Sequence, residues 1–350
     1  MVSYFAEEAY QTHILQGVSR TFALTIPQLP PGLRQVVGNG YLLCRITDTI
    51  EDEPQLTPEQ KRNFSQEFVN VIAGEACPKA FSQALLPLLS EATLAAEKDL
   101  IEHTACIIRL THGFSVAQQA ALLRCVRIMA QGMADFQQHN SLACLPNLAE
   151  MNRYCYYVAG VVGEMLTELF CHYSPRIALQ NEKLQPLAVS FGQGLQMTNI
   201  LKDIWEDRQR GVCWLPRDVF TQVGCDLTQL LPHHYDPAFG AGLARLIALT
   251  HTHLHNALHY ILLIPAHEQG IRRFCLWALG MAILTLRNIN KKRDFSAGHQ
   301  VKISRSSVQA TIVVSNFASY SDNSLRLLFY LLTRTLPQQQ TLSIGLANSS

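Results

Sequence analysis

Two acidic segments, far apart in the chain, contain the residues best suited to bind a divalent cation. In the first, Glu51 and Asp52 follow Asp48 by three and four residues. On a helix this spacing places all three carboxylates on one face, where their charges repel one another. A hard cation such as Mg²⁺ would remove that cost, because it binds carboxylate oxygens and keeps positions for water and phosphate. Taken alone, the segment fits a solvated helix end equally well, since Pro54 follows it closely.

The second acidic segment favours metal binding. Gln196, Asn199, Asp203 and Asp207 recur at intervals of three, four and four residues, so a helix would present them on one face. A stripe of amides and aspartates is not typical of plain solvation, for which Lys and Glu would serve better. Two helices that face each other with such stripes would hold several Mg²⁺ ions, and these ions could bind a departing diphosphate.

The elements that must position these stripes are helices. Apolar residues recur with helical periodicity over most of the chain, and alternating strand patterns are almost absent. Thr57, Pro58 and Gln60 have the signature of a helix start with a capping box. The helical periodicity predicts an all-α fold. Because no repeat of solenoid length is present, we predict a single domain over residues 1–336, followed by a flexible C-terminal tail over residues 337–350.

Composition narrows the class of function. The chain has a formal net charge of +1, and 48% of its residues are hydrophobic. The hydrophobic fraction allows a sizeable core. The small net charge produces no overall electrostatic field that would attract nucleic acid. The ten cysteines show no CxxC spacing, which argues against a zinc site or a disulfide framework and for a reducing cytosol. We therefore expect a cytoplasmic protein that does not bind nucleic acid.

No segment has the character of a membrane anchor. The N-terminus carries acids and no apolar core of signal-peptide length. The longest apolar stretch, residues 274–286, is shorter than the roughly 18 residues that a spanning helix needs. We expect a soluble protein without a transmembrane anchor, which contacts the membrane only peripherally.

A third segment, residues 154–163, combines an aromatic start with a run of small residues. Small side chains let a second helix, or an extended prenyl chain, come close. An aromatic face can also stabilise a carbocation through its quadrupole. Tight helix packing is the simpler interpretation, and it is compatible with a functional one.

These segments together resemble the motifs of the head-to-head isoprenoid synthases, the squalene and phytoene synthase family. Residues 154–163 contain the complete signature YCxYVAGxVG. Residues 48–52 read DTIED, which is similar to the DTxED of the squalene branch, whereas the phytoene branch is closer to DDxxD. The resemblance covers residues 10–310 or so. It implies an isoprenoid synthase-type helical bundle with a central cavity, and the implied metal ligands are Asp48, Glu51, Asp52, Asp203 and Asp207.

The resemblance also implies roles for individual side chains. Tyr154 would lie at the reacting centre and assist proton handling during ring formation. Arg45 lies one helical turn before Asp48, and from this position we expect it to contact the same phosphate. Phe274 would stabilise a cation, although Leu279 stands where a polar amide is expected.

Substrate contacts follow in the same way. A hydroxyl beside a guanidinium, as in the SRxF-like start Ser19–Arg20, suits a diphosphate. Lys202 and Arg208 flank the second acidic segment. The predicted substrate-binding residues are Ser19, Arg20, Tyr41, Val158, Gln196, Asn199, Lys202 and Arg208.

A basic segment near the C-terminus bears on the cofactor. Residues 301–305, VKISR, are similar to the VKIRKG segment that the squalene branch uses for nicotinamide-cofactor phosphates. The resemblance therefore implies NADPH binding by Lys302 and Arg305, although Ser304 replaces a basic residue. A Rossmann site is excluded, because no GxGxxG follows a strand.

The implied reaction is the magnesium-dependent condensation of two farnesyl diphosphate molecules to presqualene diphosphate, followed by NADPH-dependent reductive rearrangement to squalene. Three alternatives stay open. A dehydrosqualene or phytoene synthase would need no reductant, and a hydroxysqualene-forming enzyme would trap the cation with water. A non-catalytic, membrane-associated helical binding protein would leave the two carboxylate stripes unexplained.

Three histidines suggest a different metal site. His251, His255 and His259 recur every four residues, which would place their rings on one helix face. A metal site needs further ligands and a second shell. The neighbouring Leu254 and Leu258 instead favour an ordinary amphipathic helix.

Overall fold

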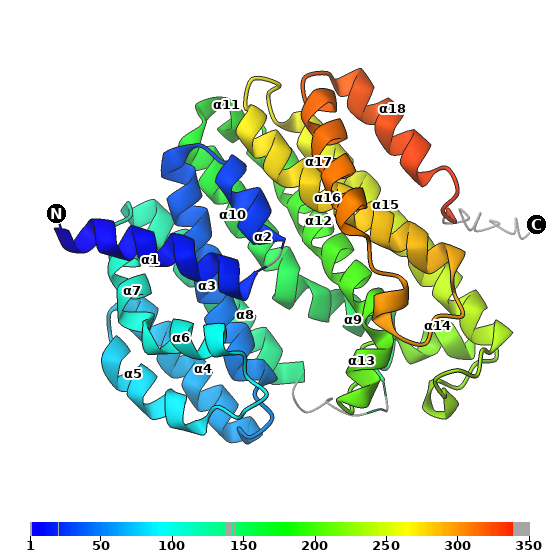
Figure 1. The fold of residues 1–350 in the computed structure, drawn as a ribbon, viewed down its shortest axis with the longest axis horizontal. Helices are drawn as coiled ribbons and strands as arrows, with labels where there is room; N and C mark the ends of the chain where they lie inside the picture. The colour runs from blue at the N-terminus through cyan, green and yellow to red at the C-terminus, as the bar shows by residue number, and fades with distance from the viewer. Residues whose placement is uncertain (1, 20, 137–141, 143, 339–350) are drawn as a thin grey trace, which may run out of the picture.

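The computed structural model describes residues 2–19, 21–136, 142 and 144–338, and its regular structure is helical (Figure 1). Within these residues the only β-type pairing is an isolated bridge between Leu145 and Pro216. The predicted all-α fold class is therefore confirmed. Arg20 and residues 339–350 of the predicted tail lie outside the described residues, and the predicted domain boundary at residue 336 stays a prediction.

Eighteen α-helices run through the described residues. In chain order they are α1 (Val2–Val18), α2 (Phe22–Thr25), α3 (Pro31–Asp52), α4 (Pro58–Ala73), α5 (Pro78–Leu85), α6 (Ala95–Glu102), α7 (Thr104–His112), α8 (Val116–Phe136), α9 (Leu148–Cys155), α10 (Val161–Tyr173), α11 (Pro175–Ala178), α12 (Asn181–Lys202), α13 (Ile204–Gln209), α14 (Arg217–Thr221), α15 (Pro237–Leu263), α16 (Gln269–Lys291), α17 (Arg305–Ala318) and α18 (Asp322–Thr333). A π-helical turn, Tyr156–Gly160, joins α9 to α10.

The predicted helix start at Thr57 is confirmed. Thr57 Oγ1 accepts a hydrogen bond from Gln60 N, and Gln60 Oε1 accepts one from Thr57 N. These two bonds satisfy donors that the first turn of α4 would otherwise leave free. At the other end, Gly74 adopts a left-handed conformation with φ 80° and closes the helix.

The long helices surround the centre of the molecule. α12 packs against α10, α15 and α16, while α3 packs against α8 and α10. In Figure 1, α4, α5, α6 and α7 gather on one side of this group, and α17 and α18 lie on the other side, towards the C-terminus. The buried apolar side chains of these elements form one continuous core, which positions α3 and α12 for the site described below.

Two glycines allow α12 to approach the signature segment. A Cβ atom at Gly163 would lie 2.3 Å from the carbonyl oxygen of Ala188, and one at Gly192 would lie 2.1 Å from that of Ala159. Backbone atoms of packed helices cannot move away at low cost, so both positions require glycine. The interpretation of residues 154–163 as a close helix contact is thereby confirmed.

Candidate active site

A cavity of about 850 Å³ lies between the end of α3 and the α12–α13 segment. We call it the polar cavity. All five predicted metal ligands line it, together with Arg45, Tyr154, Gln196, Asn199 and Lys202 from the other predictions. The carboxylates outnumber the cations, since the lining holds Asp48, Glu51, Asp52, Glu53, Glu97, Asp203 and Asp207 against Arg45, Lys61, Lys202 and Arg210.

On the α3 wall of the polar cavity, ionisation of the carboxylates is unfavourable. Burial and the neighbouring Asp52 raise the pKa of Asp48 to about 7. Burial and Asp52 also raise the pKa of Glu51 to about 8, even though Lys61 opposes the shift. The Lys61 ammonium donates to the backbone carbonyl of Glu51. Arg45, whose Nη1 lies 3.8 Å from Asp48 Oδ2, opposes the rise in the pKa of Asp48, but Arg45 and Lys61 together do not offset the burial. A bound dication would supply the missing positive charge.

The opposite wall of the polar cavity, which we call the second wall, is formed by α12 and α13. It differs from the sequence prediction in one respect. A single helix was expected to carry the stripe from Gln196 to Asp207, but the structure divides it at Asp203, whose φ is −100° and ψ 14°. The helical pattern of hydrogen bonds nevertheless continues across this break. Asp203 N donates to Asn199 O and Asp207 N donates to Asp203 O, each over 2.9 Å. The four polar residues consequently still face one cavity.

Cations accompany the carboxylates on this second wall. Lys202 Nζ lies 2.8 Å from Asp203 Oδ2, and the Arg210 guanidinium pairs with Asp207. Burial raises the pKa of Asp207, although Arg210 opposes the shift. Arg210 also reaches across to Asp52, with Nη1 3.9 Å from Oδ1, so it connects the two walls.

Tyr154 is buried beside the polar cavity. Its ring stacks on Trp214, with centroids 4.0 Å apart and an interplanar angle of 9°. Burial, reinforced by the negative charge of Glu51 and Asp52, raises the pKa of Tyr154 well above its ordinary value. Its phenol therefore stays protonated at neutral pH and is available to hydrogen-bond an anionic group.

The loop that carries Trp214 is fastened to a second loop. Leu145 N donates to Leu215 O over 3.0 Å, and Arg217 N donates to Leu145 O over 2.8 Å. Beside this bridge, the thiol of Cys144 lies 2.8 Å from that of Cys213. These contacts hold the indole against Tyr154.

An apolar cavity of about 250 Å³ adjoins the polar one. Five residues line both, namely Arg45, Asp48, Val158, Gln196 and Asn199. Val158 belongs to the π-helical turn, an irregularity that is frequent at functional sites. The result is a site that is ionic at one end and apolar at the other.

The predicted residues Tyr41 and Phe274 line the apolar cavity. Tyr41 donates its hydroxyl to Val18 O and accepts a hydrogen bond from Arg45 Nη2. Phe274 is buried, with the rings of Phe22 and Phe170 at centroid distances of 6.4 and 6.1 Å. Aromatic faces thus surround the space next to the ionic end.

Two predicted diphosphate contacts have other partners. Ser19 Oγ accepts a hydrogen bond from Phe22 N at the start of α2. Arg208 donates to the backbone carbonyls of Leu227 and Leu230, each over 3.1 Å. Neither side chain belongs to the lining of the two cavities. The structure therefore does not bring Ser19 and Arg208 together with the carboxylates.

The predicted cofactor residues Lys302 and Arg305 are exposed and do not line the cavities. The segment that precedes them packs against α13, because Gly298 N donates to Glu206 Oε1 and the Trp205 indole donates to Phe295 O. This packing places residues 295–298 beside the second acidic wall.

Sequence reasoning did not assign several residues that line the polar cavity, among them Lys61, Glu97, Arg210 and Trp214. Arg210 follows Asp207 by three residues, and this helical spacing was a usable signal. Lys61, Glu97 and Trp214 lie on other elements, and only the tertiary fold brings them to the cavity.

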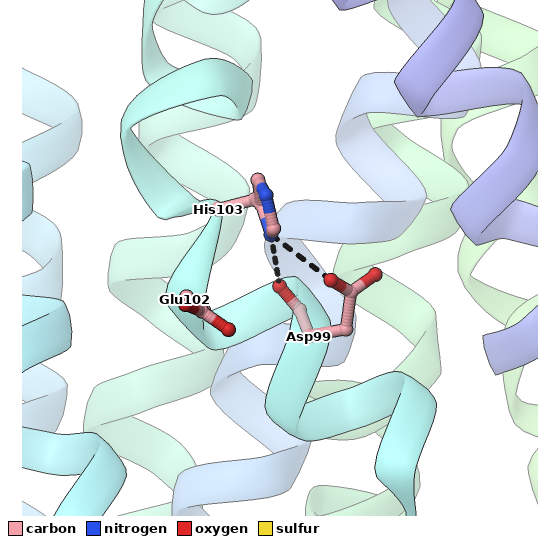
Figure 2. A group of neighbouring side chains, drawn as sticks. All are labelled: Asp99, Glu102 and His103. Atoms are coloured by element: carbon pink, nitrogen blue, oxygen red, sulfur yellow. Dashed lines mark hydrogen bonds and ion pairs between the residues drawn. The ribbon is translucent and has the colours of Figure 1, made fainter.

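A compact trio of potential metal ligands lies elsewhere. Figure 2 shows Asp99, Glu102 and His103 on α6 and directly after it. Within the part of the chain that the structure describes, they are the only three His, Cys, Asp or Glu residues whose ligand atoms all lie within 4.8 Å of one another. His103 Nδ1 contacts both the carbonyl and the carboxylate of Asp99, which is an ordinary arrangement at a helix end. The predicted ligands of the polar cavity line two opposed walls and do not form such a trio.

Two of the three histidines of α15, His251 and His255, contact α18. His255 and His259 have ring centroids 4.4 Å apart, and both His251 and His255 contact the ring of Phe329. His251 Nδ1 lies 3.2 Å from Pro337 O. Their described contacts are therefore with helix packing partners.

Comparison with known proteins identifies the family. The sequence model of the Squalene/phytoene synthase family matches residues 15–307. The chain belongs to this family. Among curated relatives, it is 29% identical over 278 residues to a squalene synthase of Eremothecium gossypii and 28% identical over 322 residues to one of Schizosaccharomyces pombe. These alignments cover 78% and 88% of this chain, but only 60% and 66% of the two relatives.

Solved structures agree on the fold. A TcSQS complex with the ligand E5700 gives a TM-score of 0.76 at 23% identity and covers 96% of this chain and 93% of that chain. A dehydrosqualene synthase in complex with a ligand gives a TM-score of 0.65 at 20% identity, over 89% and 96% of the two chains. The expected isoprenoid synthase-type bundle is thus confirmed. Among the described residues, no helix has both the length and the apolar character to cross a membrane.

Proposed function

We propose that the protein is a squalene synthase, which condenses two farnesyl diphosphates to presqualene diphosphate and then reduces this product to squalene. One observation carries the proposal, namely a carboxylate-lined cavity that shares five lining residues with an adjoining aromatic, apolar one. An allylic diphosphate has the same division into a charged head and an apolar tail. The curated relatives named squalene synthase support this choice of reaction.

The residues of the polar cavity suit magnesium. Its donors are carboxylate and amide oxygens, which are the ligands that Mg²⁺ prefers. The lining has seven carboxylates against four cationic groups, and burial raises the pKa of both Asp48 and Glu51. We assign Asp48, Glu51, Asp52, Asp203 and Asp207 as the ligands. When bound, the metal would neutralise the charge of the leaving diphosphate.

The cationic side chains would hold the diphosphate itself. Arg45 lies at the junction of the two cavities, while Lys202 and Arg210 line the second wall. Gln196 and Asn199 line both cavities and would orient the substrate where its head meets its tail. A guanidinium matches phosphate oxygens in a planar, two-pronged contact.

The apolar cavity would protect the carbocations. Val158, Tyr41 and Phe274 line it, and such a lining excludes water that would otherwise trap a cation as an alcohol. The face of Phe274 would stabilise positive charge through its quadrupole. Tyr154, protonated and buried beside the polar cavity, would assist proton transfer to the departing diphosphate during ring closure.

We assign NADPH as the reductant, with Lys302 and Arg305 as contacts for its phosphates. Both side chains are exposed and follow the segment that packs on α13. NADPH would supply the hydride that ends the second half-reaction. A cytoplasmic enzyme with peripheral membrane contact fits this chemistry, and all ten cysteines are free, as in reducing compartments.

The test is an incubation of purified protein with farnesyl diphosphate and Mg²⁺, with and without NADPH, followed by product analysis. Squalene formed only with NADPH, and presqualene diphosphate accumulating without it, would support the whole proposal. Dehydrosqualene or hydroxysqualene formed regardless of NADPH would retain the condensation and reject the cofactor assignment. Turnover of geranylgeranyl diphosphate alone would point to phytoene synthesis, and no turnover would reject the enzyme.

A further inference from the structure

Exposed apolar side chains concentrate on the two C-terminal helices. Fifteen large apolar residues are exposed in the described part of the chain, and seven of them lie between Val313 and Leu331. Phe317 is 79% exposed and Tyr330 63%. We use the name C-terminal face for six exposed apolar side chains of α17, α18 and the turn between them, which are Val313, Phe317, Tyr320, Leu327, Tyr330 and Leu331. Patches of this kind mark interaction sites.

A groove of about 270 Å³ lies next to the C-terminal face. It runs between α17 and α18, with α15 and α16 beneath it. Its lining is almost entirely apolar and includes Leu279, Ile283, Leu328 and Leu332. The helices therefore leave apolar surface unpaired both outside and between them.

The charge around the C-terminal face is one-sided. Between Val313 and Arg334 the charged residues are Asp322, Arg326 and Arg334. The one acid among them, Asp322, pairs with the buried Arg272 at 2.9 Å. Arg326 is exposed on α18 and Arg334 directly after it, and Arg273 donates a hydrogen bond to Tyr320.

We propose that the C-terminal face docks onto an anionic lipid bilayer. Apolar and aromatic side chains would enter the boundary between headgroups and acyl chains, while Arg326 and Arg334 would contact the lipid phosphates. Tyrosine is favoured at this depth, because its ring is apolar and its hydroxyl is polar. A second copy of the chain fits less well, since two faces with the same positive charge would repel. The docking proposal rests on the proposed function in one respect, because it assigns to the C-terminal face the peripheral membrane contact that was proposed there.

The test is flotation of the full chain with vesicles of phosphatidylcholine, with or without 30 mol% phosphatidylglycerol. We expect binding that requires the anionic lipid and weakens at high salt. The combined Phe317→Ser, Leu327→Ser and Tyr330→Ser variant should lower the vesicle-bound fraction roughly tenfold. The Arg326→Glu and Arg334→Glu variant should lower it only on anionic vesicles. A matched control, Val116→Ser with Leu179→Ser, alters residues that are 84% and 83% exposed but lie outside the face, and it should bind normally.

Three outcomes would overturn the proposal. The first is normal vesicle binding by the serine variant of the face, and the second is an equal loss of binding by the control variant. The third is a wild-type dimer that only the serine variant of the face dissociates into monomers. Folding is monitored by thermal melting, and turnover in detergent micelles should match the wild type. Flotation does not depend on turnover, so an inactive protein that still floats would reject the proposed function while retaining the docking face.

Discussion

The two carboxylate walls of the polar cavity are built differently. On α3, a continuous helix carries Asp48 and Glu51, and burial raises the pKa of both towards or above neutrality. On α12–α13 the helix is interrupted at Asp203, and each aspartate has a cation beside it, Lys202 for Asp203 and Arg210 for Asp207. On α3, Arg45 lies 3.8 Å from Asp48, whereas Lys202 lies 2.8 Å from Asp203. The α3 wall therefore depends more strongly on an added cation, and the second wall is more fully neutralised by the protein itself.

The strongest test of this contrast is to remove one carboxylate from each wall. We expect Asp48→Asn to lower turnover of farnesyl diphosphate about 10³-fold and Asp203→Asn about 10²-fold, because the latter leaves Lys202 free to contact the diphosphate. Steady-state rates at saturating Mg²⁺ would measure both. Glu102→Gln, which changes an exposed carboxylate of the trio in Figure 2, is the control and should be neutral. Normal turnover by either aspartate variant would remove that residue from the catalytic site.

A second test concerns the backbone contact that holds α12 in place. We expect Gly192→Ala to lower the free energy of unfolding by about 3 kcal/mol, because its Cβ would lie 2.1 Å from the carbonyl oxygen of Ala159. Gly32→Ala is the matched control within α3, since nothing lies within 4 Å of its Cβ, and helix propensity predicts a gain of up to about 1 kcal/mol. Urea unfolding would measure both. Equal stabilities would mean that the helices separate at little cost.

The raised pKa of Glu51 predicts a pH dependence of stability without metal. Below the pKa of the unfolded carboxyl, near 4.5, both states are protonated and the contribution is complete. As the pH rises from there to about 8, the unfolded state loses its proton while the folded state retains it, so stability is lost. We expect Glu51→Gln to remove a decline on the order of 2 kcal/mol between pH 5 and 8. Urea titrations in EDTA would measure it, and an unchanged pH slope in the variant would contradict it.

Much of this site could be predicted because its residues are local. Asp48, Glu51 and Asp52 lie within five residues, and the helical period alone brings them together. The break at Asp203 could not be foreseen, since the periodic pattern continues through it. Lys61 and Trp214 reach the cavity from other elements, and their placement depends on tertiary packing that one sequence does not reveal. Likewise, the partners of Arg208 lie on a loop about twenty residues further along.

The smallest expected effects distinguish Arg210, which lines the second wall, from its neighbour Arg208, which does not. Arg210 pairs with Asp207 and reaches Asp52, so Arg210→Gln should raise the KM for farnesyl diphosphate about tenfold by removing a phosphate contact. Arg208 donates to two loop carbonyls, so Arg208→Gln should leave KM unchanged and lower the free energy of unfolding by about 1 kcal/mol. Kinetics and urea unfolding of both variants distinguish the roles. The reverse result, a raised KM for Arg208→Gln alone, would show that Arg208 turns to the substrate and that the second wall is rearranged when substrate binds.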